Sequence, residues 1–315
     1  MIRFLIKCLL FGCPVLAGFI AVAYMADGYT DRYYLRLTSP AQSALIVGSS
    51  RAARGIRPDV LNTALAQEYP RPVYNFSFTY GHSPFGPTYL TAIGRKLDSP
   101  ARNGYFIVSV DPWELSASKT SPEDSTAFVE NKLMLANNTR INGYPCFSYL
   151  INDYPNPYLT LLTGKIHRSI FHYRPEFFLH DDGWLEMSGP LDSVSVARRR
   201  YSILDQYANL IAAETISHTR LSYLRKTIAF LHRYGDVYVV RLPVHPDVQA
   251  QEDSYCPRLS IIIDSIAHGM GVPYFDFTAS GERYTYTDGS HLSKESAAVL
   301  SRQLASLIIQ HRHAR

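Results

Sequence analysis

Cysteine is scarce in this sequence. Only four cysteines occur among 315 residues, and no Cys-x-x-Cys, His-Glu-x-x-His or other Cys/His cluster has the ligand spacing of a metal site. The sequence therefore predicts no metal site, and none of its motifs calls for a cofactor. Cys8 and Cys13 lie in an apolar N-terminal run, which leaves Cys146 and Cys256 either to pair in an oxidising compartment or to stay as buried free thiols.

An excess of charge of one sign is nearly absent as well. Lysine and arginine together number 31 against 27 aspartates and glutamates, a formal net charge of +4, and only 18% of the residues are charged. A nucleic-acid-binding protein would carry a basic stripe, so we expect no nucleic-acid partner. The sequence is instead 46% hydrophobic, with 23 tyrosines and 15 phenylalanines, which excludes a disordered chain and allows a sizeable packed core.

One long hydrophobic run stands at the N-terminus. The chain is uncharged from Cys8 to Met25, and the run counted from Phe4, at about 1.5 Å per residue, is long enough to span a hydrocarbon layer of about 30 Å. Arg3 and Lys7 at its start predict a cytoplasmic N-terminus, with the chain outside the membrane after Asp27. A cleaved signal peptide is the alternative, because Ala21-Val22-Ala23 has the form of a cleavage site. The length favours an uncleaved single-pass anchor at residues 1–26, followed by a domain at 27–315.

Short apolar strands alternate with helical segments in two parts of that domain. We expect strands at 44–47, 73–78, 105–110, 237–242 and 273–277. We expect helices at 58–68, 85–97, 220–234, 259–268 and after Ser293, with Gly235 as a C-terminal cap. The alternation predicts an α/β fold with about five parallel strands and helices on both faces of the sheet. Residues 112–200 show no sustained period, which indicates a large insertion or cap.

Three motifs follow or precede these elements at positions that suit chemistry. In open parallel sheets, ligands bind beyond the carboxyl ends of the strands. Gly48-Ser49-Ser50 follows the first strand, Asn75 to Gly81 end the second, and Asp288-Gly289-Ser290-His291 precedes the last helix. A serine nucleophile needs a base, and the base needs a carboxylate to orient it. Each motif alone also fits an ordinary turn or helix cap, but together they are more specific, because the Asp-x-x-His motif offers a base and its carboxylate to a serine of the Gly-Ser-Ser motif.

In this order the three motifs resemble those of the SGNH (GDSL-like) hydrolase superfamily. The resemblance implies a flavodoxin-like three-layer sandwich, with Ser50 as nucleophile, His291 as base and Asp288 orienting it. It also implies an oxyanion hole formed by Ser50 and Gly81. The chain reads Ser109-Val110-Asp111-Pro112 where the superfamily has Gly-x-Asn-Asp. The Asp111 carboxylate therefore either turns away from the oxyanion or leaves a hole with only two donors.

Further segments narrow the resemblance. The sequences GSSR (48–51), YNFS (74–77), VDPWEL (110–115) and RLPVHP (241–246), behind a membrane anchor, are similar to SGNH-like proteins associated with membrane-bound O-acyltransferases. That group includes alginate acetylation proteins and DltD-like proteins of lipoteichoic-acid D-alanylation. The resemblance implies a periplasmic acyltransferase or esterase that acts on a polysaccharide or cell-wall polymer, with a polytopic membrane-bound O-acyltransferase as partner. A non-catalytic scaffold or glycan-binding partner of such an enzyme is the alternative, and a secreted esterase for small esters is a third.

Four further residues are candidates for substrate binding. Arg51, next to Ser50, either holds an anionic group or braces the turn. Asn75, Asp111 and His245 follow predicted strands and are expected at the ligand-binding edge of the sheet. The segment 180–184 (HDDGW) forms either a sugar-binding groove or a turn followed by a buried tryptophan.

Overall fold

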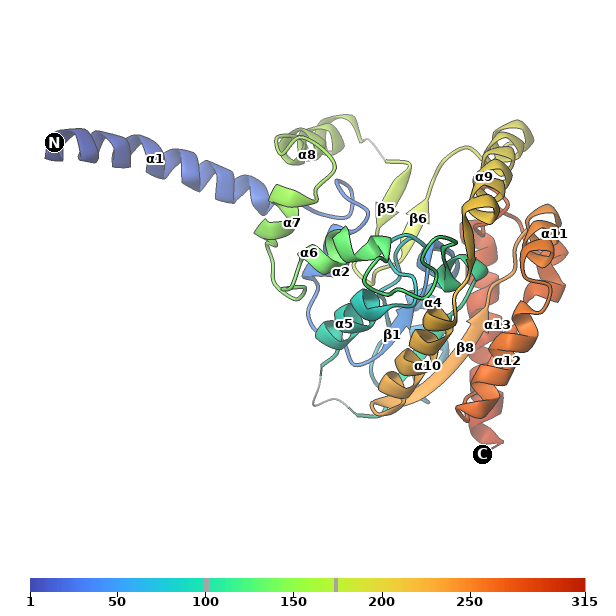
Figure 1. Ribbon diagram of the computed structural model, residues 1–315. Coiled ribbons are helices and arrows are strands. Elements are labelled where there is room, and N and C mark those ends of the chain that lie inside the picture. Colours follow the sequence, from blue (N-terminus) through green and yellow to red (C-terminus); the bar gives the residue numbers. More distant parts are fainter. Residues whose placement is uncertain (99–101, 173–174, 315) are drawn as a thin grey trace.

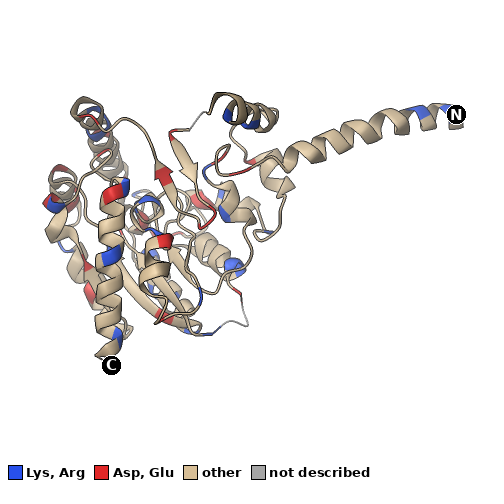
Figure 2. Cartoon of the chain, turned by 180° about the vertical axis from the view of Figure 1, so that it is seen from behind, with Lys and Arg blue, Asp and Glu red and all other residues tan. Residues whose placement is uncertain are grey.

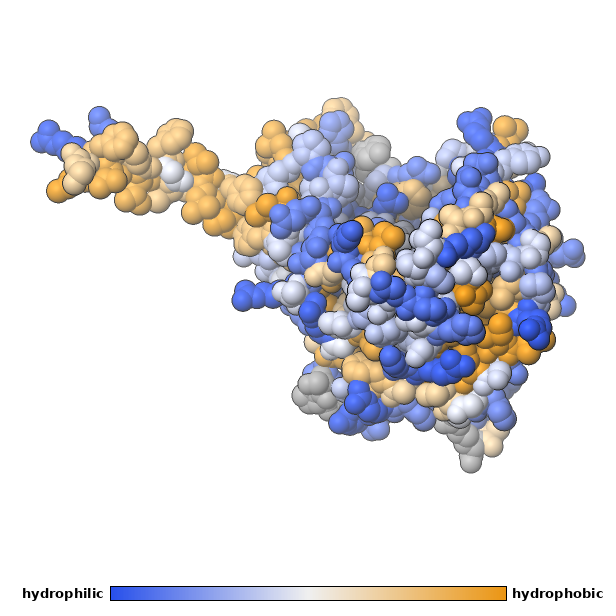
Figure 3. All heavy atoms as spheres, in the orientation of Figure 1, coloured by the Kyte–Doolittle hydropathy of each residue, from blue (hydrophilic) through white to orange (hydrophobic). Residues whose placement is uncertain are grey.

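The computed structural model describes residues 1–98, 102–172 and 175–314. Figure 1 shows one long helix, α1 (Ile2–Ala23), which projects away from a body built around a central sheet. α1 is long and apolar enough to cross a membrane, with a mean hydropathy of 2.2 over its most apolar window. Its surface is hydrophobic along most of its length (Figure 3), and its basic residues lie near its free end (Figure 2).

The central sheet confirms the expected five parallel strands. They are β1 (Leu45–Val47), β2 (Tyr74–Asn75), β3 (Gly104–Ser109), β8 (Gly235–Arg241) and β9 (Tyr274–Asp276), in the spatial order β2-β1-β3-β8-β9. Every neighbouring pair is parallel. Counted along the chain within this sheet, the order is 2-1-3-4-5, which is the flavodoxin-like order.

Helices cover both faces because alternate residues of each strand point in opposite directions. On β3, Phe106 and Val108 join a core with α5 (Pro87–Lys96), α10 (His218–His232) and α12 (Leu259–Gly269). Tyr105 and Ile107 join the opposite core, with α4 (Pro58–Ala64) and α13 (Lys294–His313). The result is a three-layer sandwich, and the last helix begins at the predicted cap, because the Ser293 side chain accepts a hydrogen bond from the N–H of Ser296.

The other elements are mostly short. They are α2 (Tyr34–Thr38), α3 (Ser50–Gly55), η1 (Pro112–Leu115), β4 (Ser116–Ser118), η2 (Val129–Lys132), α6 (Met134–Asn137), α7 (Phe147–Asn152), α8 (Thr160–Phe171), β5 (Phe177–Leu179), β6 (Leu185–Met187), α9 (Ser193–Ala213), β7 (Glu214–Ile216), α11 (Pro246–Tyr255) and η3 (Thr278–Arg283).

The region expected as an irregular insertion, 112–200, contains several of these elements. β4 pairs with β7, and β5 pairs with β6, both antiparallel. Helix α9 begins inside the region and runs past its expected end, to Ala213. α7 and α8 lie beside the inner end of α1, whereas β5, β6 and α9 lie on the body (Figure 1).

Gly235 differs from its expected role, and the state of two cysteines decides between the alternatives left open by the sequence. Gly235 is the first residue of β8 and not a helix cap; α10 ends at His232, and its C-cap residue is Arg233, in an ordinary right-handed conformation. A Cβ on Gly235 would lie 1.9 Å from the backbone oxygen of Gly104, so the close approach of the two strands requires glycine there. Cys146 and Cys256 are both buried free thiols.

Candidate active site

Ser50 lies at the carboxyl end of β1, on the turn into α3. Gly48 has a φ of +152°, and a Cβ there would lie 2.8 Å from the Cβ of Ser109, so both backbone and space require glycine. Ser49 is the N-cap of α3, and its hydroxyl accepts a hydrogen bond from the N–H of Arg51 at 3.2 Å. Ser50 is therefore the first residue of a helix, at the edge where ligands bind in parallel sheets.

The structure brings together the three residues predicted to carry the chemistry. The Oγ of Ser50 lies 2.8 Å from Nε2 of His291, although the two residues are 241 positions apart. Nδ1 of His291 lies 2.9 Å from Oδ2 and 3.0 Å from Oδ1 of Asp288. Oδ1 of Asp288 also accepts hydrogen bonds from the N–H groups of Ser290 and His291, which fix the carboxylate in its turn. This is the hydrogen-bonded order of a Ser-His-Asp triad.

Arg54 is a fourth member of this arrangement that the sequence analysis missed. It follows Ser50 by four positions on α3, so both side chains lie on one helix face. Its Nη1 donates to Oδ2 of Asp288 at 3.2 Å, and its Nη2 donates to the hydroxyl of Thr287. Its Nε has no hydrogen-bond partner within the described part of the chain. The i, i+4 spacing from Ser50 was the signal that could have identified Arg54.

Burial and charge set the protonation states of the pair. Burial acts to raise the pKa of Asp288, but His291, its hydrogen bonds and Arg54 together hold that pKa well below the usual range. Burial, and then the charge of Arg54, lower the pKa of the His291 imidazole. At neutral pH the carboxylate is therefore charged and the imidazole neutral. A neutral Nε2 that faces a serine hydroxyl can accept its proton.

We predict a shift of the acidic limb of the pH–rate profile when Arg54 is replaced. Because only the neutral imidazole acts as a base, kcat/KM falls as the pH drops through the pKa of His291, which lies below 6.5. Arg54→Met removes a cation that lowers this pKa, so the acidic limb should move to higher pH. The pH dependence of kcat/KM for an aryl ester checks this. Arg57→Met, which removes a cation paired with Asp59 instead, should leave the limb in place, and an unmoved limb in Arg54→Met would contradict the electrostatic role.

Asp111 turns away from the position of an oxyanion. Its carboxylate accepts hydrogen bonds from the N–H groups of Trp113 and Glu114, in a capping box of η1, and from the hydroxyl of Ser49. Of the two alternatives posed by the sequence, the structure shows the first. The N–H of Ser50, by contrast, has no hydrogen-bond acceptor among the described residues. As an open donor in the first turn of a helix, it can stabilise an oxyanion.

Gly81 does not line the cavity that holds Ser50 and His291. It lies in a neighbouring cavity of about 230 Å³, beside Trp113. The residues of the segment 75–81 that line the cavity with Ser50 are Phe78, Thr79 and Tyr80. The position of Gly81 therefore does not support its predicted oxyanion role.

Arg51 braces the turn, which was one of the two expected roles. It is buried, and its guanidinium donates to the hydroxyls of Ser290 and Tyr207 at 3.1 and 3.2 Å. It also forms an ion pair with Glu252. These contacts connect the start of α3 to the turn that carries His291.

Asn75 and His245 are structural as well, which corrects their expected contact with substrate. The Asn75 side chain is buried and donates to the backbone oxygens of Ala52 and Ile56 at 2.9 and 3.0 Å, so it holds the end of α3. His245 is the N-cap of α11 and accepts a hydrogen bond from the N–H of Asp247. Neither residue lines the cavity at Ser50.

The segment 180–184 has the second of its two expected roles, a turn followed by a buried tryptophan. Trp184 is buried, and its indole N–H donates to the backbone oxygen of Arg54 at 2.9 Å. Gly183, with a φ of +84°, packs against the backbone of Asn75. The segment is a turn followed by a buried tryptophan, and it supports α3 from outside.

The cavity at the triad has a volume of about 180 Å³. Three arginines and four aromatic residues contribute to its wall, and no carboxylate does; the full lining is Arg32, Tyr33, Arg36, Ser50, Ala53, Arg54, Phe78, Thr79, Tyr80, Phe177, Leu185, Ile203, Gln206 and His291. Within the described part of the chain, no cluster of three His, Cys, Asp or Glu residues could hold a metal ion. The arrangement can therefore perform nucleophilic acyl chemistry in a cationic, aromatic site.

Comparison with known proteins does not extend this description. No model of a protein family matches the chain, and no curated protein matches it. What the fold and the site define is a class: a three-layer α/β protein with a Ser-His-Asp arrangement at the carboxyl end of its first strand.

Proposed function

We propose that this chain is a membrane-anchored acyltransferase or esterase of the SGNH type, which works outside the cytoplasmic membrane through an acyl group carried on Ser50. The observation that carries the proposal is the chain of hydrogen bonds from Ser50 through His291 to Asp288, with a buried Arg54 behind the carboxylate. Such a chain activates a hydroxyl for attack on an ester carbonyl.

The reaction proceeds in two acyl transfers. Nε2 of His291 takes the proton of the Ser50 hydroxyl while Oγ attacks the carbonyl carbon of the acyl donor, and the N–H of Ser50 stabilises the oxyanion. The leaving alcohol departs with the proton from His291, which leaves an acyl ester on Ser50. A hydroxyl of the acceptor then loses its proton to His291 and attacks the ester. Ser50 recovers its proton, and Asp288 stays ionised throughout.

The position of the cavity supports work close to a membrane. Arg32 and Tyr33 line it, and α1 ends at Ala23, so the cavity wall lies at most about 30 Å of extended chain from the apolar helix. Arg3 and Lys7 at the start of α1 favour a cytoplasmic N-terminus and a periplasmic domain. A site near the periplasmic surface of the cytoplasmic membrane could receive an acyl group from a polytopic membrane-bound O-acyltransferase.

Contacts between α1 and the domain favour an uncleaved anchor over a signal peptide. The hydroxyl of Tyr158 donates to the backbone oxygen of Phe19 at 2.6 Å, and the two rings stack at 4.3 Å. Ala23 is buried in the main core. Cleavage after Ala23 would remove all of these contacts.

The cavity wall supports a glycan or cell-wall polymer as acceptor. Tyr33 and Phe177, which are partly exposed, offer aromatic faces that can pack against sugar rings. Arg54 pairs with Asp288, and Arg36 is buried with its guanidinium on the backbone oxygen of Gly183. Arg32, which lines the cavity without an ion pair among the described residues, favours a polymer that carries negative charge.

The test is the O-acyl content of the cell-surface polymer in a strain whose chromosomal copy is replaced by Ser50→Ala. We expect the content to fall to that of a strain without the protein, because Ser50 provides the hydroxyl that faces Nε2 of His291. Ser306→Ala, which removes an exposed serine on α13, should leave it unchanged at equal protein abundance. An unchanged content in Ser50→Ala would contradict the proposal and favour a non-catalytic scaffold.

A further inference from the structure

α8 carries an apolar stripe that points away from the rest of the protein. Leu161 and Arg168 face the body: Leu161 is fully buried, and Arg168 pairs with Asp27 at 2.9 Å. Leu159, Ile166 and Ile170 fall on the opposite side at helical spacing, and Leu159 and Ile170 are each 63% exposed. A helix with one buried and one exposed apolar stripe has an unpartnered face.

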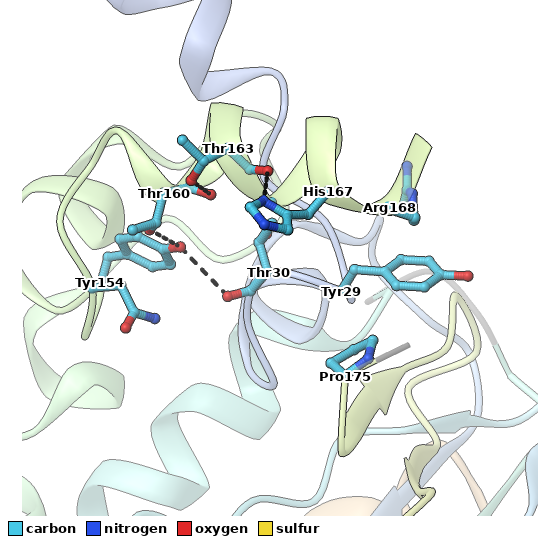
Figure 4. Close-up of a pocket in the computed structure, with 10 residues that line it drawn as sticks. Tyr29, Thr30, Tyr154, Thr160, Thr163, His167, Arg168 and Pro175 are labelled. Atoms are coloured by element: carbon cyan, nitrogen blue, oxygen red, sulfur yellow. Dashed lines mark hydrogen bonds between the residues drawn. The ribbon is translucent and has the colours of Figure 1, made fainter. Parts of the chain in front are cut away.

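The polar side of the same helix lies between these two stripes. Figure 4 shows Thr160, Thr163 and His167 of α8 on the side of a cavity that Tyr29 and Thr30 close from below. The cavity has a volume of about 520 Å³. The hydrophilic residues of α8 therefore line this cavity, and the exposed apolar stripe lies on a different side of the helix.

α7 extends the outer apolar stripe. Tyr149 and Leu150 are buried, whereas Phe147 and Ile151, four positions apart, are exposed, Ile151 by 65%. We call α7, α8 and the residues between them (147–171) the α7–α8 unit. Its outer apolar side chains are Phe147, Ile151, Leu159, Ile166 and Ile170.

The α7–α8 unit surrounds the inner end of α1. The rings of Tyr158 and Phe147 lie 4.3 and 6.4 Å from the ring of Phe19, which precedes the end of α1 by four residues, or about 6 Å of helix. Next to them the Tyr144 hydroxyl donates to the backbone oxygen of Tyr24 at 2.7 Å. A helix that crosses a bilayer would place these rings at the membrane–water interface, where aromatic residues concentrate.

The charge of the segment fits the surface of an anionic membrane. From Tyr154 to His172 the sequence holds Lys165 and Arg168 and no aspartate or glutamate. Arg168 faces the body and pairs with Asp27, so Lys165 is the basic residue of this stretch that remains for a lipid headgroup. Asp153, the acidic residue of the α7–α8 unit, accepts hydrogen bonds from the side chains of Asn137 and Asn138. Helices that combine an apolar stripe with basic residues lie in the interface of membranes with anionic lipids.

We propose that the outer face of the α7–α8 unit lies in the headgroup layer of the membrane that α1 enters, so that the domain has a fixed orientation on the bilayer. The inference rests on the membrane anchoring in the proposed function. The occupant of the face is the lipid surface, because the face is continuous with the apolar surface of α1 through Phe19. Arg32 and Tyr33 of the Ser50 cavity follow α1 closely in the sequence, so this orientation holds the cavity at a fixed distance from the membrane.

The experiment uses the full chain in vesicles of phosphatidylcholine and phosphatidylglycerol, with and without bromine on the acyl chains. Bromine quenches tryptophan emission only at short range, and the chain's own Trp113 and Trp184 are buried, so their emission can be subtracted. Tryptophan replaces one residue at a time: Ile151 and Ile170 on the outer face, Leu10 in α1, and Ile261 on α12 as the control. Ile261 is 66% exposed, and α12, the helix that carries it, lies on the far side of the body from α1 (Figure 1).

We expect brominated lipid to quench the emission of Ile151→Trp and Ile170→Trp, with a blue shift on reconstitution, and to leave Ile261→Trp unchanged. Leu10→Trp should be quenched in either case if α1 spans the bilayer. If brominated lipid quenched Leu10→Trp but not Ile170→Trp, the inference about the α7–α8 unit would be overturned and the membrane anchoring would stand. A blue shift of Ile170→Trp emission without quenching would mean that protein covers the face, and this result would also overturn the inference. An unquenched Leu10→Trp would contradict the anchoring itself.

Discussion

Replacing His291 with alanine is expected to slow the reaction of Ser50 with a fluorophosphonate by at least about 10⁴-fold, as for the removal of other triad members. The reason is geometric: Nε2 of His291, at 2.8 Å, is the proton acceptor for the Ser50 hydroxyl. Without it the hydroxyl stays protonated and is a weak nucleophile. The second-order rate constant of inactivation of the full chain in detergent measures the effect.

His245 supplies the matched control for this variant. It lies at the same end of the sheet, but it caps α11 and does not line the cavity. His245→Ala should therefore react at nearly the wild-type rate. If His291→Ala reacted as fast as His245→Ala, the assignment of His291 as the base would be wrong.

Glu252→Ala is expected to lower the free energy of unfolding by about 3–5 kcal/mol, because it leaves buried charges without a partner. Oε1 of Glu252 pairs with Arg51, and Oε2 accepts a hydrogen bond from Arg241 at 3.3 Å. All three side chains are buried. Urea unfolding of the full chain in detergent, followed by tryptophan fluorescence, measures the change.

A surface ion pair provides the comparison. Asp59 is half exposed and pairs with Arg57, so Asp59→Ala should lower the free energy of unfolding by less than about 1 kcal/mol.

Because Arg51 connects α3 to the turn with Ser290, Glu252→Ala should also weaken the support of Ser50. Equal effects of the two variants on the free energy of unfolding would contradict a buried ionic brace.

The sheet and the triad were the parts that the sequence could predict. Runs such as 44–47 and 105–108 are continuously apolar because both of their faces are covered, and this is a strong local signal. The motif order places Ser50 after one strand and His291 before the last helix. Ligands bind beyond the strand ends of a parallel sheet, where Ser50 was expected. The meeting of Ser50, His291 and Asp288 was predicted from the family resemblance that the order of the motifs carries.

The roles of the remaining edge residues depended on side-chain direction, which the sequence does not contain. Asn75, Asp111 and His245 lie near the predicted edge, but each side chain caps a helix or holds a backbone segment. Arg54 was missed because α3 has only six residues and was not expected as a helix, so the i, i+4 spacing of Arg54 from Ser50 was not considered. Gly235 was assigned to a helix end because a close strand contact and a helix cap both favour glycine.

The elements of the insertion could not be predicted for a related reason. Strands such as β5 and β6 have three residues each, and the exposed apolar stripe of α8 obscures the single buried stripe that marks an ordinary surface helix. That second stripe is the feature from which we infer contact with the membrane.

The central claim, that Ser50 is the nucleophile, is tested most directly by locating the adduct of a fluorophosphonate on the full chain. Mass spectrometry of the digested protein, with fragmentation that separates Ser49 from Ser50, identifies the labelled oxygen. The account predicts one adduct, on Ser50, in the wild-type protein and none in His291→Ala. An unlabelled Ser50 in the folded protein, or an adduct on another residue that persists in Ser50→Ala, would contradict it.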